Sequence, residues 1–181
     1  MIIPKSPNVL RLSIGRLWNG ERCPDSRLSA LVEIQKTETG ILIRTILPKL
    51  PGARLSESTT GSRLINIDDF DRVCLFFVEE GGQYLEIKIS ATGQYLVLGF
   101  DQPRQVVADF SDIPFVVNHK VSDSGQTINE AVIPLELFPS QLTALNAFLV
   151  AGNQTLAYYP VSGSEPDLHQ PNLFPLAKIE E

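Results

Sequence analysis

The chain has 181 residues, 43% of them hydrophobic and 20% charged, with a formal net charge of −6. This composition excludes a largely disordered chain and predicts one folded domain, residues 1–181, with a substantial core. Lys and Arg residues are scattered singly between Lys5 and Lys178. Without a basic stripe, an acidic chain is a poor partner for nucleic acid or an anionic membrane, so we expect neither.

The N-terminal sequence and the cysteines indicate a compartment. Residues 1–18 have no long apolar core and are interrupted by Pro4 and Pro7, which is not typical of a secretory leader. The longest apolar runs are far shorter than the roughly 20 residues that span a bilayer. We therefore expect a cytoplasmic protein without a membrane anchor. Cys23 and Cys74 are far apart and lack metal-ligand spacing, so we expect two buried, reduced thiols.

Short β-patterned segments separated by turn residues follow one another along the chain. We expect strands at residues 28–34, 41–47, 63–67, 73–78, 84–89, 95–100, 115–117, 128–133, 147–150 and 155–159. Helix is restricted to one or two short turns within 134–145, because Pro139 interrupts that segment. The pattern predicts an all-β fold, an antiparallel two-sheet β-sandwich.

A hairpin at residues 82–100 is the clearest of these patterns, with its turn at 91–93. Its first strand alternates apolar Leu85, Ile87 and Ile89 with polar Tyr84, Glu86 and Lys88. Such alternation places the apolar residues on the core face and the polar residues on the opposite face. Residues 48–61, rich in Pro, Gly, Ser and Thr, predict a long exposed loop, which is either functional or a plain insertion.

Three segments together resemble a known group of proteins. They are Trp18-Asn19-Gly20, the hairpin YLEIKISATGQYLVLGF, and the C-terminal YYPVSGSEPDLHQPNLFPL. Their order and spacing resemble family 9 carbohydrate-binding modules and the related DOMON-like domains, which are β-sandwiches. Nearer still is an uncharacterised single-domain group of bacteria and animals with the same start and hairpin. The resemblance covers nearly the whole chain and implies a carbohydrate or glycan-like ligand.

The chain departs from that pattern at two positions. Many carbohydrate-binding relatives have an acidic residue where this chain has Cys74, so a sugar-binding carboxylate is missing from the strand before the hairpin. In the C-terminal Pro-Asp-Phe-His motif, Leu168 replaces the Phe, which preserves a structural role. Fold resemblance alone transfers no ligand.

Sugar sites on β-sandwiches place an aromatic ring against the sugar and use a few polar groups for its hydroxyls. On that chemistry and the resemblance we expect ligand contacts from Trp18, Tyr84, Glu86, Arg104, Tyr158 and His169. Four of them have a structural alternative: Trp18 as a packing residue, Tyr84 and Glu86 as a solvated face, and Arg104 as a surface residue. Asp167 and His169 form either an acid and imidazole pair at a site or the polar part of a closing strap.

Recognised catalytic motifs are absent from the sequence, so we expect no enzyme. The only methionine is Met1, which makes a haem between Met and His axial ligands unsupported, and we expect no cofactor and no metal. The carboxylate pairs 68–69 and 79–80 are interpreted as solubilising residues or, more weakly, as calcium ligands.

The preferred hypothesis is a non-catalytic ligand-binding module. The alternative is a protein-interaction or scaffold sandwich that presents a strand edge or the loop 48–61 to another protein. A hydrolase using Asp167 and His169 is the least supported hypothesis, because it lacks a nucleophile.

Overall fold

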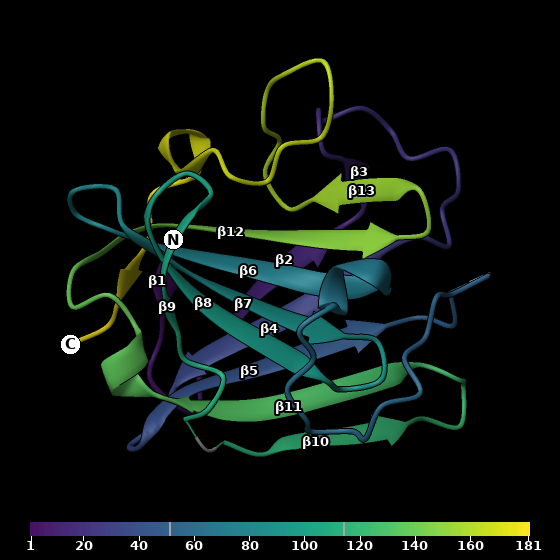
Figure 1. Ribbon diagram of the computed structural model, residues 1–181, viewed down its shortest axis with the longest axis horizontal. Helices are drawn as coiled ribbons and strands as arrows, with labels where there is room; N and C mark the ends of the chain where they lie inside the picture. Colours follow the sequence, from purple (N-terminus) through teal and green to yellow (C-terminus); the bar gives the residue numbers. More distant parts are fainter. Residues whose placement is uncertain (51, 114) are drawn as a thin grey trace.

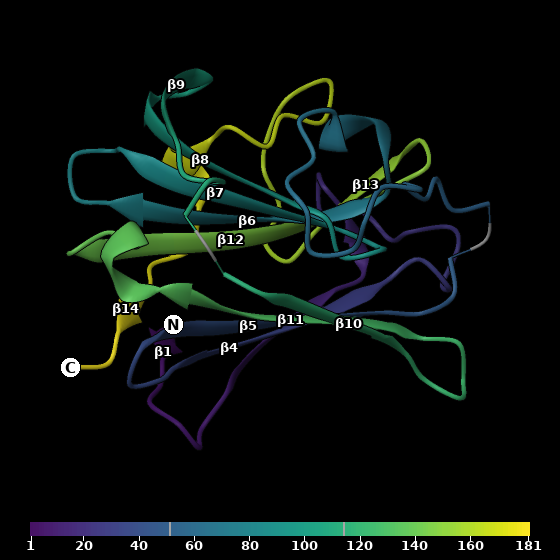
Figure 2. The same cartoon turned by 60° about the horizontal axis from the view of Figure 1, so that its bottom comes forward.

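The computed structural model describes residues 1–50, 52–113 and 115–181. Two antiparallel sheets pack face to face, which confirms the predicted β-sandwich (Figures 1 and 2). A short parallel pair, β1 (Ile2–Ile3) and β14 (Lys178–Ile179), joins the two ends of the chain.

Each sheet is built from strands that are mostly neighbours in sequence. The five-stranded sheet has the order β10 (Val117–Val121), β11 (Thr127–Pro134), β5 (Gly40–Leu47), β4 (Ala30–Lys36), β2 (Leu10–Ile14). The seven-stranded sheet has the order β3 (Arg16–Leu17), β13 (Gln154–Ala157), β12 (Leu142–Ala151), β6 (Arg72–Glu79), β7 (Tyr84–Ser90), β8 (Tyr95–Gln102), β9 (Gln105–Asp109). Three single turns of 3₁₀-helix complete the described elements: η1 (Ile67–Asp69), η2 (Leu135–Leu137) and η3 (Pro171–Leu173).

Several predicted elements differ from the observed ones. Residues 63–67 form no strand; Arg63 makes one isolated bridge to Tyr95, and η1 begins at Ile67. Of the predicted strand 115–117, only Val117 lies in a strand, the first residue of β10. Residues 134–145 contain the single turn η2, as expected, but β12 already begins at Leu142, earlier than predicted. The edge strands β2 and β9 were not predicted, although Leu10, Leu12 and Ile14 of β2 alternate with polar residues and two of them enter the core.

The main hydrophobic core fills the space between the two sheets. Leu85, Ile87 and Ile89 of β7 point into it, as their alternation predicts. The residues on the opposite face of β7 are buried as well, so this strand is covered on both faces. The neighbouring strand β6 is buried at every residue between its two ends. The seven-stranded sheet therefore has a second packed layer on its outer face.

Two separate parts of the chain cover this outer face. Near one end, Ile67 of η1 packs with Leu64 and Leu96 in a small apolar cluster. Near the other end, the C-terminal segment contributes Phe174 and Val161 to a larger apolar cluster, the outer core. The outer core consists of Cys74, Phe76, Val78, Tyr84, Phe100, Ala144, Phe148, Ala157, Val161 and Phe174. The two covers leave the middle of the face to polar residues.

The described part of the predicted loop 48–61 contains no strand, and residue 51 lies outside the described residues. Leu50 and Ser56 are buried, and the carbonyl of Ser58 accepts a hydrogen bond of 2.6 Å from Gln94 in the hairpin turn. This part of the loop is therefore attached to the tip of the hairpin. Cys23 and Cys74 are buried and free, and burial raises the pKa of the Cys74 thiol to about 12.

Candidate functional site

A row of polar side chains follows the outer face of β7. Tyr84, Glu86 and Lys88 alternate with the residues that enter the main core, so all three lie on the same face. All three are buried, and Glu86 is only 2% exposed. The interpretation of Tyr84 and Glu86 as a solvated face is therefore wrong. Buried polar groups require partners, so the surroundings of this row decide its chemistry.

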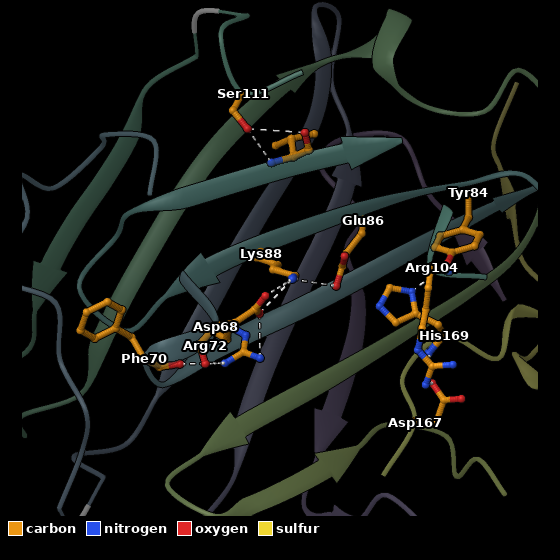
Figure 3. Close-up of polar contacts among 11 residues, drawn as sticks. Asp68, Phe70, Arg72, Tyr84, Glu86, Lys88, Arg104, Ser111, Asp167 and His169 are labelled. Carbon is orange, nitrogen blue, oxygen red and sulfur yellow. Dashed lines mark hydrogen bonds and ion pairs between the residues drawn. The ribbon is translucent and has the colours of Figure 1, made fainter. Parts of the chain in front are cut away.

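An ion cluster lies at the Lys88 end of the row (Figure 3). The Lys88 Nζ is 2.9 Å from both carboxylate oxygens of Asp68 and 3.7 Å from Oε1 of Glu86. Arg72 forms an ion pair of 2.9 Å with the same Asp68 carboxylate. Its Nη1 also donates to the backbone carbonyls of Asp68 and Phe70. The cluster combines two cations and two carboxylates in a mostly apolar layer.

Glu86 is the most unusual member of the cluster. Its Oε2 is buried and has no hydrogen-bond partner among the described residues. Burial raises the pKa of Glu86 to about 7, although Lys88 and Arg72 act in the opposite direction. Burial alone would lower the pKa of Lys88, but the nearby carboxylates outweigh it and the pKa is raised. At neutral pH Lys88 is therefore charged, while Glu86 exchanges between its acid and its carboxylate.

A second polar network lies at the Tyr84 end of the row. The Tyr84 hydroxyl lies 2.7 Å from Nδ1 of His169 and accepts a hydrogen bond of 3.2 Å from the backbone N–H of Arg104. Asp167 accepts the backbone N–H of His169 at 2.9 Å and pairs with the Arg104 guanidinium at 2.8 Å. Arg104 has a positive φ of 63°. These contacts fasten the C-terminal segment to the β8–β9 turn, which agrees with the strap interpretation of residues 167–169.

The protonation of this network follows from its burial. Burial, helped by Lys88 and Arg104, lowers the pKa of His169 to about 4, so the imidazole is neutral at pH 7. The Tyr84 hydroxyl accepts from Arg104 and therefore directs its own proton to Nδ1 of His169, which assigns the imidazole proton to Nε2. The Tyr84 ring is stacked on Phe100 with centroids 4.7 Å apart, so one ring face is already occupied.

The structure brings five of the six predicted ligand residues to the same side of the seven-stranded sheet. Trp18 is half-buried and packs against the outer core, with its backbone N–H bonded to Thr155 of β13. Tyr158 is separated from the others, because it packs against the main core between the sheets. It lines a different hollow, shared with Ser13 and Gln126.

Three residues of the cluster were not among the predicted ligand residues. Asp68 was interpreted as a solubilising residue or, more weakly, a calcium ligand, Lys88 only as part of the polar face of its strand, and Arg72 was not considered. One signal was available in the sequence: residues 73–78 are apolar without alternation, which is typical of a strand buried on both faces. Charged residues beside such a strand must be paired, and Arg72 with the acidic residues at 68, 69 and 71 lies directly before it, although the sequence does not say which carboxylate pairs.

Among the described residues, no group of three or more His, Cys, Asp or Glu side chains is arranged to hold a metal ion. Within the same residues, no helix is both long and apolar enough to cross a membrane.

Comparison with protein families finds no matching family model. The chain is similar to the UPF0462 protein C4orf33 homolog of Mus musculus, with 28% identity over 87% of this chain and 85% of the mouse protein. It is also similar to UPF0462 protein C4orf33 of Homo sapiens, with 27% identity over 86% of this chain and 81% of the human protein. The Danio rerio homolog is 26% identical over 76% of this chain and 74% of its own length.

Solved structures with a similar fold include carbohydrate-binding modules and a protein named for that activity. A candidate carbohydrate-binding protein from Bacteroides uniformis superposes with a TM-score of 0.71 and 13% identity, over 95% of this chain and 87% of that chain. A family 9 carbohydrate-binding module from Caldicellulosiruptor kristjanssonii, in complex with cellotriose, gives a TM-score of 0.62 and 11% identity, over 99% and 93%. At these identities the likeness shows the fold alone. The resemblance to DOMON-like domains stays a prediction.

Proposed function

We propose that this protein is a non-catalytic binding module for a carbohydrate or glycan-like ligand, with its site around Glu86 on the outer face of the seven-stranded sheet. The unpartnered Oε2 of Glu86 carries the proposal. A buried carboxyl oxygen without a partner is costly, and a ligand hydroxyl would satisfy it. Near its pKa of about 7, Glu86 is suited to hydroxyls because its acid form donates and its carboxylate accepts.

Two further features support a sugar ligand. The half-buried Trp18 packs against the outer core, on the same side of the seven-stranded sheet as Glu86, and supplies an aromatic ring of the kind that binds sugars. The family 9 module with this fold is named as a complex with cellotriose in one structure and with glucose in another. Binding would consist of stacking and hydrogen bonds, and no bond would be broken.

Isothermal titration calorimetry with glucose, glucuronate, cello-oligosaccharides and other simple sugars tests the proposal. We expect at least one sugar to bind, and Glu86→Gln to weaken that binding by about tenfold, because one charged hydrogen bond is lost. Glu33→Gln is the matched control, since Glu33 is a paired carboxylate on the other sheet. The proposal fails if no sugar binds, or if both variants bind as the wild type does.

Protein interaction through a strand edge is the second candidate function. The edge strand β9 exposes two adjacent apolar residues, Val106 at 52% and Val107 at 68%. An exposed apolar strand edge can pair with a strand of another chain. If this function is correct, a stoichiometric partner should co-purify with the protein and be lost in Val107→Lys, while sugar titrations show no heat.

A further inference from the structure

The ion cluster combines two fixed cations with one removable anion. Arg72 and Lys88 arise from β6 and β7, and their side chains are nearly buried, with 11% and 9% exposed. The Asp68 side chain that neutralises them comes from η1 and is 56% exposed. Movement of Asp68 into solvent would require only a rotation of its side chain, whereas movement of either cation would disrupt the sheet.

The position of Arg72 does not depend on the Asp68 carboxylate. Its Nη1 donates to the backbone carbonyl of Asp68 at 2.9 Å and to that of Phe70 at 3.0 Å. Lys88 is held by its place on β7 and by Glu86 at 3.7 Å. If the Asp68 carboxylate leaves, both cations therefore stay in place, with Glu86 as their nearest remaining carboxylate. An incoming carboxylate would find the two cations that Asp68 now occupies.

Two unpartnered atoms specify what else such a ligand must carry. Oε2 of Glu86 and Nε of Arg72 are both buried without a hydrogen-bond partner among the described residues. Ligand hydroxyls can donate to the first and accept from the second. A neutral sugar that displaced Asp68 would satisfy these atoms and leave the two buried cations short of an anion. A simple inorganic anion would neutralise the cations and offer no hydroxyls to the remaining atoms.

We infer that the site takes an acidic carbohydrate, a uronate-type sugar acid, whose carboxylate replaces that of Asp68 on Lys88 and Arg72. This inference rests on the proposed function and names its ligand class. In the free protein Asp68 occupies the anion position and acts as an internal competitor. Glu86 and Lys88 are nearly buried, whereas the Asp68 side chain is 56% exposed, so in the proposed complex the ligand enters from the side of Asp68.

Calorimetric titration of three matched ligands tests this inference on the wild-type protein. The ligands are glucuronate, the uncharged methyl ester of glucuronic acid, and glucose. We expect glucuronate to bind at least about tenfold more tightly than the other two, because only its carboxylate can pair with the cations. Added salt should weaken the glucuronate complex most, since its binding depends on charge.

Asp68→Asn supplies the second test, with Asp25→Asn as the control, because Asp25 pairs with Arg27 far from the cluster in sequence. Removal of the internal competitor should strengthen glucuronate binding by about tenfold and leave the affinity for glucose nearly unchanged. Equal affinity for glucose and glucuronate in the wild type would overturn the inference and leave the proposed function intact. Absence of binding by all three ligands would overturn the inference, and it would overturn the proposed function as well if the cello-oligosaccharides and the other sugars also fail to bind. If Asp68→Asn does not fold, the wild-type series decides.

Discussion

Each sheet carries a set of opposite charges on its outer face, but only one set is buried. On the five-stranded sheet, Glu33 pairs with Arg11 and Arg44 at 2.9 Å, and the Arg11 side chain is 63% exposed. On the seven-stranded sheet, Lys88 and Glu86 lie beneath Asp68 and the covering segments. Both sets combine basic side chains with carboxylates. The difference arises from what packs above them.

The two sets of charges should therefore have different energetics. Exposed ion pairs contribute about 0–1 kcal/mol, because water competes with each partner and salt screens both. A buried set pays a large desolvation cost and is often no more stabilising than apolar residues of the same size. The buried set is thus poorly explained by stability, and the unpartnered Glu86 makes it less favourable still. This contrast favours a binding role for the outer face of the seven-stranded sheet.

The largest expected effect comes from removal of the central cation. Lys88→Ala leaves Glu86 and Asp68 without their shared partner and should lower the free energy of unfolding by about 3–5 kcal/mol. Urea denaturation measures this change. Arg44→Ala, the matched change on the other sheet, should cost about 1 kcal/mol or less. Equal losses in the two variants would contradict the contrast between the sheets.

The pH dependence of stability separates the two ends of the buried row. The pKa of Glu86 is raised to about 7, so the folded state binds its proton more tightly than the unfolded chain does. Its stabilising contribution is fully present below the unfolded pKa of about 4.3 and is lost as the pH rises through 7. The pKa of His169 is lowered to about 4, so its contribution is present above about pH 6.5 and is lost as the pH falls through 4.

Two variants resolve these opposing contributions. Relative to wild type, Glu86→Gln should become progressively less stable as the pH falls from 7 to 4.5, by at most about 1.4 kcal/mol per pH unit. His169→Asn, which keeps an acceptor for the Tyr84 hydroxyl, should become relatively more stable over the same range. Urea denaturation at half-unit pH intervals measures both differences. Curves that run parallel to wild type would show that neither group has a shifted pKa.

A smaller loss of stability is expected when the Tyr84 hydroxyl, which joins the C-terminal segment to the sheet, is removed. Tyr84→Phe leaves Nδ1 of His169 and the N–H of Arg104 without this partner and should cost about 1–3 kcal/mol. The exposed Tyr159 supplies the control, since Tyr159→Phe should leave the free energy of unfolding nearly unchanged. Equal effects of the two changes would show that the hydroxyl network is not a structural contact.

The hairpin strands could be predicted from alternation because their inner faces are strongly apolar. β12 was predicted too short, since residues 134–145 were interpreted as the one helix-like segment, whereas β12 begins at Leu142. The unbroken apolar run at 73–78 indicated that the outer face is covered, but the covering segments could not be predicted, because η1 and the C-terminal segment have no periodic pattern and their contacts are long-range. The strand face of Tyr84 and Glu86 was therefore predicted correctly, whereas their interpretation as solvent-exposed residues was wrong, because both are buried.

The smallest expected loss of stability follows removal of an exposed charge. Its dependence on salt concentration distinguishes it from the loss in the buried cluster. Arg11→Ala removes one of the two arginines that contact Glu33, so Arg44 still pairs with that carboxylate. We expect a loss of at most about 0.5 kcal/mol that disappears in high salt. The loss in Lys88→Ala should persist in high salt, because counterions cannot reach a charge beneath the covering segments. If salt removed both losses equally, the cluster around Glu86 would be accessible to ions, and displacement of Asp68 would not be needed to open the site.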